Sequence, residues 1–168
     1  MNTLVKAIEL VSELSDSYFV EKLWNGTDQV SANIGELAVN IMCSSDIYEV
    51  TINDVSHNVK TPEVLKNILE YAKSESLLRE IISNLAEEKI DSYLIGHYSK
   101  GHSEVCLSCG TNKYNLDVTA RPNGIYTLQY MDVRNNISWR KEFSDRDELI
   151  KKIVETRKVK TARVNVLG

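Results

Sequence analysis

The chain has 168 residues, of which 42% are hydrophobic and 26% charged, with a formal net charge of −4. These values are typical of a folded globular protein, and the length favours a single domain over residues 1–168. No apolar run is long enough to cross a bilayer, and three cysteines, an odd number, predict no disulfide framework. Because Lys6, Glu9 and Glu13 interrupt the N-terminal segment, we expect no signal peptide and place the protein in the cytoplasm.

The charge is distributed unevenly along the chain. Residues 1–100 contain 16 acidic and 8 basic residues, a net charge of −8, whereas residues 101–168 contain 8 acidic and 12 basic residues, a net charge of +4. An acidic surface disfavours contact with nucleic acid and favours a basic partner. The solvated faces of helices explain the same excess, so both interpretations stay open.

Apolar residues recur at helical spacing in the N-terminal segment, where Leu4, Ile8 and Val11 fall on one face. This helix either ends near residues 15–17 or continues to residues 25–26, where Asn and Gly tolerate positive φ angles. Both alternatives give an amphipathic helix whose apolar face packs against the rest of the fold.

Strands and further helices follow. Alternation of apolar and polar residues predicts strands at 37–42 and 48–53. The Thr-Pro-Glu sequence at 61–63 predicts a helix start, because Thr can cap, Pro suits the first helical position and Glu complements the helix dipole. A second helical pattern runs through residues 77–96, and the polar segment 73–76 predicts a break between the two helices.

Residues 103–143 predict a meander of four short strands joined by three tight turns. In one turn, Pro122 fixes φ and Gly124 can adopt the left-handed conformation. Alternation along the strands places one set of side chains on a buried face. The predicted core residues of this sheet are Leu116, Val118, Leu128, Trp139 and Phe143.

A capping sequence at residues 144–147 predicts a C-terminal amphipathic helix, and Val164 and Val166 predict a last strand. Strands clustered in this way, with helices grouped elsewhere, do not have the regular alternation of a parallel α/β fold. The sequence therefore predicts an α+β fold with a largely antiparallel sheet built around the four-stranded meander and helices packed on it.

One cluster has the composition of a metal site: His97, His102, Cys106 and Cys109 could bind zinc tetrahedrally. Only one Cys pair is present, however, whereas a zinc ribbon supplies two. An odd separation in an extended strand also directs Cys106 and Cys109 to opposite faces. Strand residues and surface histidines are the alternative interpretation, and we expect no resident cofactor.

Other sites are less well supported. Cys43 and Cys106 have no local signature of a nucleophile, no glycine-rich phosphate loop occurs, and we do not expect an enzyme. The basic C-terminal segment, including Arg157, Lys158 and Arg163, could meet phosphates. A solvated helix face explains most of that charge, so a small zinc- or nucleic-acid-binding regulatory protein is kept only as the alternative function.

In overall character, a small, acidic α+β protein with no catalytic motif, the chain resembles bacterial immunity proteins that neutralise toxins. The resemblance implies that an acidic surface meets the basic active-site cleft of a cognate toxin domain, possibly a nuclease, and blocks substrate entry. It extends over the whole chain but carries no motif from which residues could be transferred. The predicted partner-binding residues are acids of the second helical pattern and a nearby aromatic anchor: Glu80, Glu87, Glu88, Asp91 and Tyr93.

Overall fold

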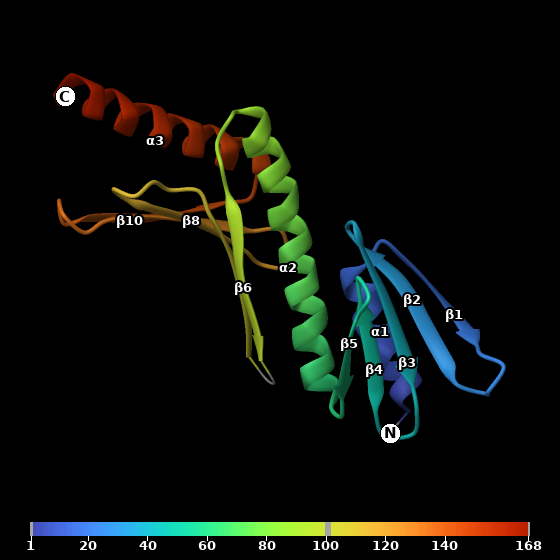
Figure 1. Cartoon of the computed structure of the whole chain (residues 1–168). Helices are drawn as coiled ribbons and strands as arrows, with labels where there is room; N and C mark the ends of the chain where they lie inside the picture. Colours follow the sequence, from blue (N-terminus) through green and yellow to red (C-terminus); the bar gives the residue numbers. More distant parts are fainter. Residues whose placement is uncertain (1, 100–101, 168) are drawn as a thin grey trace. The chain divides into compact units, whose positions relative to one another are not determined.

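The computed structural model describes the backbone of residues 2–99 and 102–167, and the side chains of these residues except 97–104 and 159–167. The chain divides into two compact units: unit 1 comprises residues 1–76 and 97–104, and unit 2 comprises residues 77–96 and 105–168. The single domain expected from the chain length stays a prediction. The order of elements repeats along the chain, because a helix followed by a five-stranded antiparallel meander occurs twice before a last helix (Figure 1).

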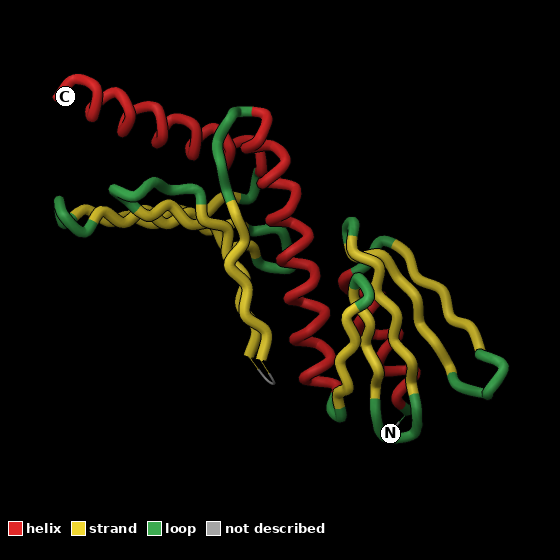
Figure 2. Tube along the Cα trace, in the orientation of Figure 1, coloured by secondary structure: helices red, strands yellow, loops and turns green. Residues whose placement is uncertain are grey.

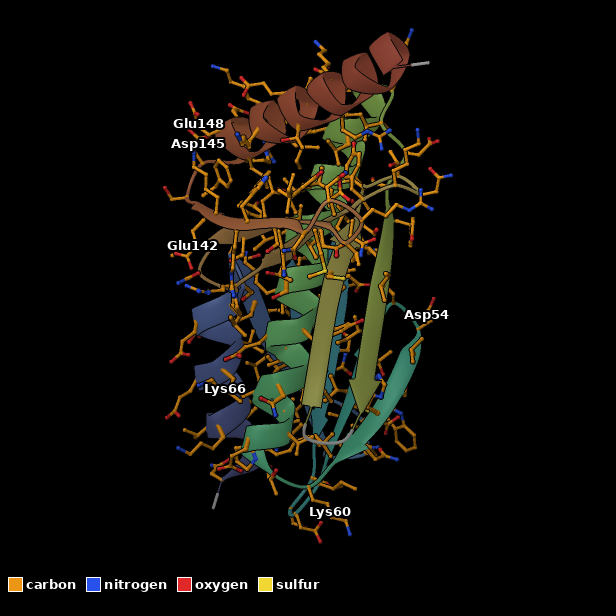
Figure 3. The ribbon with its side chains drawn as sticks, turned by 90° about the vertical axis from the view of Figure 1, so that its left-hand side faces the viewer. Asp54, Lys60, Lys66, Glu142, Asp145 and Glu148 are labelled. Carbon is orange, nitrogen blue, oxygen red and sulfur yellow. The ribbon has the colours of Figure 1, made fainter. Side chains whose placement is uncertain are left out.

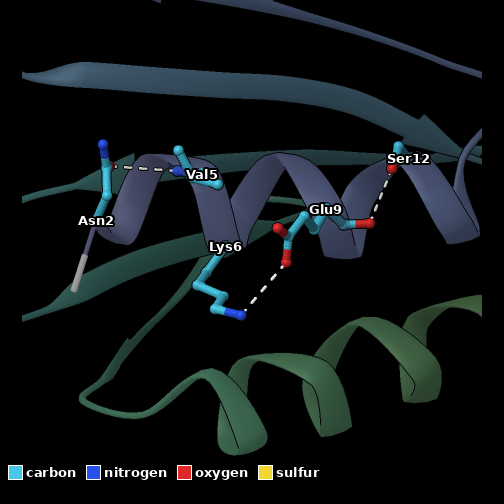
Figure 4. A network of polar contacts seen from close by, with 5 residues as sticks. All are labelled: Asn2, Val5, Lys6, Glu9 and Ser12. Atoms are coloured by element: carbon cyan, nitrogen blue, oxygen red, sulfur yellow. Dashed lines mark hydrogen bonds and ion pairs between the residues drawn. The ribbon is translucent and has the colours of Figure 1, made fainter.

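Unit 1 begins with helix α1 (Thr3–Leu14), whose start is fixed by a side-chain cap. The Asn2 side-chain oxygen accepts hydrogen bonds from the backbone N–H groups of Leu4 and Val5, at 3.0 and 3.3 Å (Figure 4). One turn later the Lys6 ammonium lies 3.5 Å from the Glu9 carboxylate. The cap satisfies two of the N–H groups that have no partner inside the helix, so α1 begins there.

Sheet A follows in unit 1 as five antiparallel strands, paired in the order of the sequence and joined by short loops (Figure 2). One face carries Val30, Ile41 and Val50, which are buried together with Ala7 and Val11 of α1. The other face carries polar side chains that are partly exposed. The strands are β1 (Ser17–Lys22), β2 (Asp28–Ile34), β3 (Leu37–Cys43), β4 (Tyr48–Ile52) and β5 (Val55–Val59).

Helix α2 (Pro62–Glu87) is continuous, so the break predicted at residues 73–76 is wrong. Ser74 and Ser76 are buried at 8% and 4% exposure, which shows that these small residues serve close packing and do not end the helix. A Cβ atom on Gly35, in the β2–β3 turn, would overlap the Ser76 side chain. The first half of α2 contributes Leu65 and neighbouring apolar residues to the core of unit 1.

Sheet B is the second five-stranded antiparallel meander. Its last four strands match the meander predicted from residues 103–143. In the predicted turn, Gly124 has φ +88 and its N–H donates to the Arg121 carbonyl at 3.0 Å. The strands are β6 (Tyr93–Ser99), β7 (His102–Ser108), β8 (Asn115–Ala120), β9 (Tyr126–Asp132) and β10 (Ile137–Phe143).

Helix α3 (Arg146–Leu167) contacts β9 and β10 and buries Leu149 and Ile153. The Asp145 carboxylate accepts the N–H of Asp147 at 2.8 Å, and acidic Asp147 and Glu148 occupy the first turn. Figure 3 shows Asp145 and Glu148 at this end of the helix, where the dipole favours negative charge.

The α+β class and the antiparallel pairing are confirmed. Of the predicted core, Leu116, Val118, Leu128 and Phe143 are buried, and Trp139 is half-buried.

Three further predictions of elements are wrong. The helix predicted through residue 96 ends at Glu87, because Lys89 adopts φ +59, and Tyr93–Ser99 form β6. Val164 and Val166 lie in α3 and not in the predicted last strand, because the helix that starts at Arg146 continues through them. Residues 17–22 form β1, so the alternative in which the first helix continues to residues 25–26 is also wrong. The Ser15 N–H and side-chain hydroxyl both bond to the Val11 carbonyl and end α1 there.

Candidate functional site

The predicted partner-binding residues lie on the last part of α2 and in the segment that follows it, up to the start of β6. Glu87, Glu88 and Asp91 are exposed, and Tyr93 follows at the start of β6 with 62% of its surface accessible. Ile95, two residues along the same strand and 52% exposed, lies on the same face as Tyr93. We call Glu87, Glu88, Asp91 and Tyr93 the acidic patch.

Helix α2 ends beside the acidic patch because the backbone forms a specific C-terminal cap. Lys89 has φ +59, and the N–H of the next residue, Ile90, donates to the Leu85 carbonyl at 2.9 Å. Leu85 and Ile90 are both buried. This is the hydrogen bond and apolar pair of a Schellman ending, formed here with lysine in place of the usual glycine. It anchors the chain at Ile90 while Glu87 and Glu88 stay in solvent.

Electrostatics at this end of α2 are locally unfavourable. The last turn of the helix contains no basic residue, and Glu87 and Glu88 lie there beside carbonyl groups that already carry partial negative charge. Acids at a helix C-terminus reduce helix stability by about 0.3–1 kcal/mol each. Residues 87–93 therefore carry three exposed acids and one exposed cation, Lys89, together with the exposed Tyr93 ring.

Glu80 is placed differently from the other predicted residues. Its carboxylate lies 2.9 Å from the Arg146 guanidinium, which joins α2 to the first turn of α3. Both side chains are more than 40% exposed, so the pair contributes well under 1 kcal/mol. The structure gives Glu80 a contact within unit 2 and does not bring it into the acidic patch.

The four predicted zinc ligands are only partly visible. His97 lies in β6 and His102 begins β7, and their side chains lie outside the described residues. Cys106 is partly exposed between buried Val105 and Leu107, whereas Cys109 is buried and its Sγ lies 3.4 Å from the Leu116 carbonyl oxygen. Within the described part of the chain, no group of three or more potential metal ligands is present. Zinc binding stays a prediction.

Two buried thiols are held in the protonated form. Burial raises the pKa of Cys109 to about 12, although the charge of Arg157 opposes the shift. Burial, reinforced by the charge of Asp28, raises the pKa of Cys43 to about 11. A thiol must ionise to act as a nucleophile or to ligate metal, so burial disfavours both roles for these two side chains.

The aromatic residues of sheet B form part of its packing. The Tyr130 and Trp139 rings stack at 5.4 Å between centroids, and the Lys152 ammonium lies 5.4 Å from the centre of the Trp139 ring. Tyr130 is fully buried and cannot stack on a base. Arg157 donates to the carbonyl oxygens of Cys109 and Gly110, at 3.2 and 2.9 Å, so one cation of the predicted basic segment is engaged inside unit 2.

Sequence reasoning missed a second exposed surface, on sheet A. All six residues of β1 are exposed, including Tyr18, Phe19 and Val20, and Trp24 in the following turn is 98% exposed. The sequence does contain a pattern that favours a strand here. Three residues of high β propensity stand between the turn-forming sequences Ser-Asp-Ser at 15–17 and Asn-Gly at 25–26. The apolar run was equally compatible with a helix.

A shallow hollow of about 340 Å³ adjoins β1. Its wall includes Phe19, and its floor includes Ser31, whose hydroxyl donates to the Asn40 side-chain oxygen at 2.7 Å. The Gln29 amide donates to both of these side chains, at 3.2 and 3.3 Å. The hollow is thus lined by apolar side chains, including Phe19 and Val39, and by uncharged polar groups, of which Ser31 and Asn40 bond to each other within sheet A.

No known protein family matches this chain, and neither a curated protein nor a solved structure is similar to it at a significant level. Among the described residues, every helix is too short or too polar to traverse a lipid bilayer.

Proposed function

We propose that this chain is a protein-binding module of the toxin-neutralising type, which places its acidic patch over the basic active-site cleft of a cognate bacterial toxin domain. The observation that supports the proposal is the exposure of Tyr93 and of Glu87, Glu88 and Asp91, which stand close together in the sequence at and after a helix end where acids reduce stability. Residues that lower stability without making internal contacts are expected where a surface serves binding.

The patch has the two components that such an inhibitor needs. Three carboxylates on one exposed turn attract a basic cleft and raise the association rate, an effect that salt screens. An exposed tyrosine supplies an anchor that can be buried on contact, and interface hot spots are enriched in this residue type. The proposed partner is therefore a basic toxin domain, and the proposed site of action is the bacterial cytoplasm.

Genomic position and direct binding test the proposal together. We expect the gene to lie beside one that encodes a toxin domain, and the purified chain to bind that domain and inhibit its activity. Reversing the charge of the patch with Glu87→Lys, Glu88→Lys and Asp91→Lys is expected to weaken binding by about 100-fold, mainly through slower association. Isothermal titration calorimetry and stopped-flow kinetics measure the two effects.

A matched control carries the same charge change elsewhere. Glu13, Glu36 and Asp46 are exposed acids of unit 1, and their conversion to lysine is expected to change affinity by less than about threefold at physiological salt. Neither triple variant should have a Tm below that of the wild type, because each replaces at least one acid in the last turn of a helix with a lysine that complements the helix dipole. Equal affinity for the toxin domain in the two triple variants would exclude the patch as the binding surface, and a gene surrounded by metabolic enzymes would count against the immunity function.

A further inference from the structure

Strand β1 is an edge strand of sheet A whose centre, residues 18–20, carries neither charge nor proline. It pairs only with β2 on one side, and no other described strand lies on its second side. Phe19 is 61% exposed, and Tyr18 and Val20 are each more than 40% exposed. An open edge with apolar side chains is a template for pairing with another chain, which natural proteins normally block with charge or proline.

The hydrogen-bonding groups of β1 that face outward can be identified. Leu23 and Thr27 continue the β1–β2 register, and the Leu23 N–H donates to the Thr27 carbonyl at 2.8 Å. Backbone groups alternate between the two sides of a strand, so the odd-numbered residues of β1 face β2. Tyr18, Val20 and Lys22 therefore direct their N–H and C=O groups toward the open edge.

We propose that this edge is a homodimer interface, in which β1 pairs antiparallel with β1 of a second copy about a two-fold axis at Phe19. Tyr18 then lies opposite Val20 of the second copy, and the two exchange backbone hydrogen bonds through their outward-facing groups. The two sheets join into one ten-stranded sheet. The interface is isologous, because the same strand contributes to both sides.

The sequence around β1 is complementary to itself in this register. Asp16 lies opposite Lys22 of the second copy, so each end of the paired strands joins unlike charges, while apolar residues occupy the centre. Lys22 lies 3.7 Å from Asp28 and keeps 69% of its side chain exposed, so it can meet a second carboxylate. Moving the axis by one residue to Val20 would set Phe19 against Glu21, and moving it to Glu21 would set that acid against its own copy.

The helices leave room for this pairing. Helix α1 contacts β1, β2 and β3, and a two-fold axis perpendicular to the sheet keeps both copies of α1 on the same face. Strands are spaced by about 4.8 Å, so the two β2 strands, and the helices above them, are separated by roughly 14 Å. A helix with its side chains is about 10–12 Å wide, so the two copies of α1 fit side by side.

The molecular mass in solution tests the dimer. At about 100 µM the wild-type chain is expected to sediment with twice its mass of 19.1 kDa. Phe19→Lys places charges at the centre of the interface and should give the monomer mass at the same concentration. The matched control Val55→Lys changes an exposed apolar residue on β5, the opposite edge of sheet A, and should leave the dimer intact. A wild-type monomer, or a dimer insensitive to Phe19→Lys, would overturn the proposal.

A disulfide tests the register, and it does so even where a lysine variant folds poorly. Opposite residues at the axis have Cα atoms about 4.5 Å apart, within the range for a disulfide, so Phe19→Cys in a Cys106→Ala background should oxidise to a covalent dimer. In the Tyr18→Cys variant the two cysteines are two residues out of register, with Cα atoms more than about 8 Å apart. This variant should not form a disulfide-linked dimer. Equal cross-linking of the two variants contradicts the axis at Phe19. Because β1 belongs to unit 1 and the acidic patch to unit 2, failure here leaves the proposed function standing.

Discussion

The two sheets treat their outer edges differently. In sheet B, edge strand β10 carries Arg140, Lys141 and Glu142 along its length, all exposed. In sheet A, edge strand β1 carries Tyr18, Phe19 and Val20 at its centre, and its charged residues Glu21 and Lys22 stand only at its end. Charge within an edge strand discourages pairing with other chains, whereas an apolar centre permits it. The two antiparallel meanders thus differ at these edge strands: charged side chains protect β10, whereas β1 is open to pairing.

The largest expected effects come from the cores, which the two units build in the same way. Ile41 of β3 and Leu116 of β8 are fully buried, and truncation of either to alanine is expected to reduce the free energy of unfolding by about 2–5 kcal/mol. Urea denaturation followed by circular dichroism measures the loss. Val133→Ala, at a residue that is 78% exposed, is the control and should change stability by less than about 0.5 kcal/mol.

These core variants also test whether units 1 and 2 unfold together or separately. If both variants shift one common transition, the chain unfolds as a single cooperative domain, as its length predicts. If each variant shifts a different transition, units 1 and 2 fold separately. A loss below about 1 kcal/mol for Ile41→Ala would contradict the packing described for sheet A.

A smaller effect distinguishes the turns of the two sheets. Gly35 and Gly124 both have positive φ, +61 and +88, but a Cβ on Gly35 would overlap Ser76, whereas one on Gly124 would meet nothing within 4 Å. Gly124→Ala is expected to cost about 1 kcal/mol of backbone strain, and Gly35→Ala about 2–3 kcal/mol. Thermal unfolding of both variants provides the comparison.

A double-mutant cycle isolates the contact with α2. Ser76→Ala removes the overlapping hydroxyl, so the pair Gly35→Ala and Ser76→Ala should be coupled by about 1 kcal/mol. Gly124→Ala combined with Ser76→Ala should be additive. Additivity in both combinations would mean that Gly35 is required only for its φ angle.

The third prediction concerns one buried thiol in each unit. The unfolded thiols ionise near pH 9.0, whereas the folded pKa is about 11 for Cys43 and about 12 for Cys109. Between these limits the unfolded state has lost a proton that the folded state keeps, so stability is fully present below pH 9 and falls as pH rises. Cys109 contributes a slope of at most about 1.4 kcal/mol per pH unit.

Replacing each thiol should flatten a different part of the pH profile. Chemical denaturation between pH 8 and about 12 is expected to show a shallower decline in Cys109→Ala up to about pH 12, and in Cys43→Ala only up to about pH 11. Ser108→Ala, a neighbouring residue that does not titrate, is the control. An unchanged slope in both cysteine variants would show that neither thiol differs between the folded and unfolded states.

Local chemistry explains which elements the sequence could predict. The meander of residues 103–143 was recognisable because Pro122 and Gly124 mark a turn and the flanking strands alternate cleanly. Strand β2 was missed because small Ala32 stands in its buried row, between Val30 and Ile34, and weakens the alternation. The polar serines of α2 were mistaken for a helix break. Ser76 packs closely against Gly35, a contact that local sequence does not reveal because the two residues are about 40 positions apart.

The candidate surfaces also differ in whether local sequence or distant contacts determine them. Glu87, Glu88 and Tyr93 were chosen from the sequence as exposed residues of one long helix. They are exposed, but the helix end at Glu87 and the strand that begins at Tyr93 were not predicted. The pairing of Glu80 with Arg146 joins residues 66 apart and could not be anticipated. The open edge at β1 is a property of strand order in sheet A, which no pattern within residues 17–22 contains.

Helix α2 sets a practical constraint on dividing this protein into fragments. The first of the three points at which the chain passes between the units lies between residues 76 and 77, inside a continuous helix. Fragments ending there would carry the helical segments 62–76 and 77–87, each at or below the length of about 12–15 residues at which an isolated helix is marginal in water. A complementation reporter built from this chain is better split in a surface turn such as residues 44–47, where the strands on either side keep their hydrogen bonds.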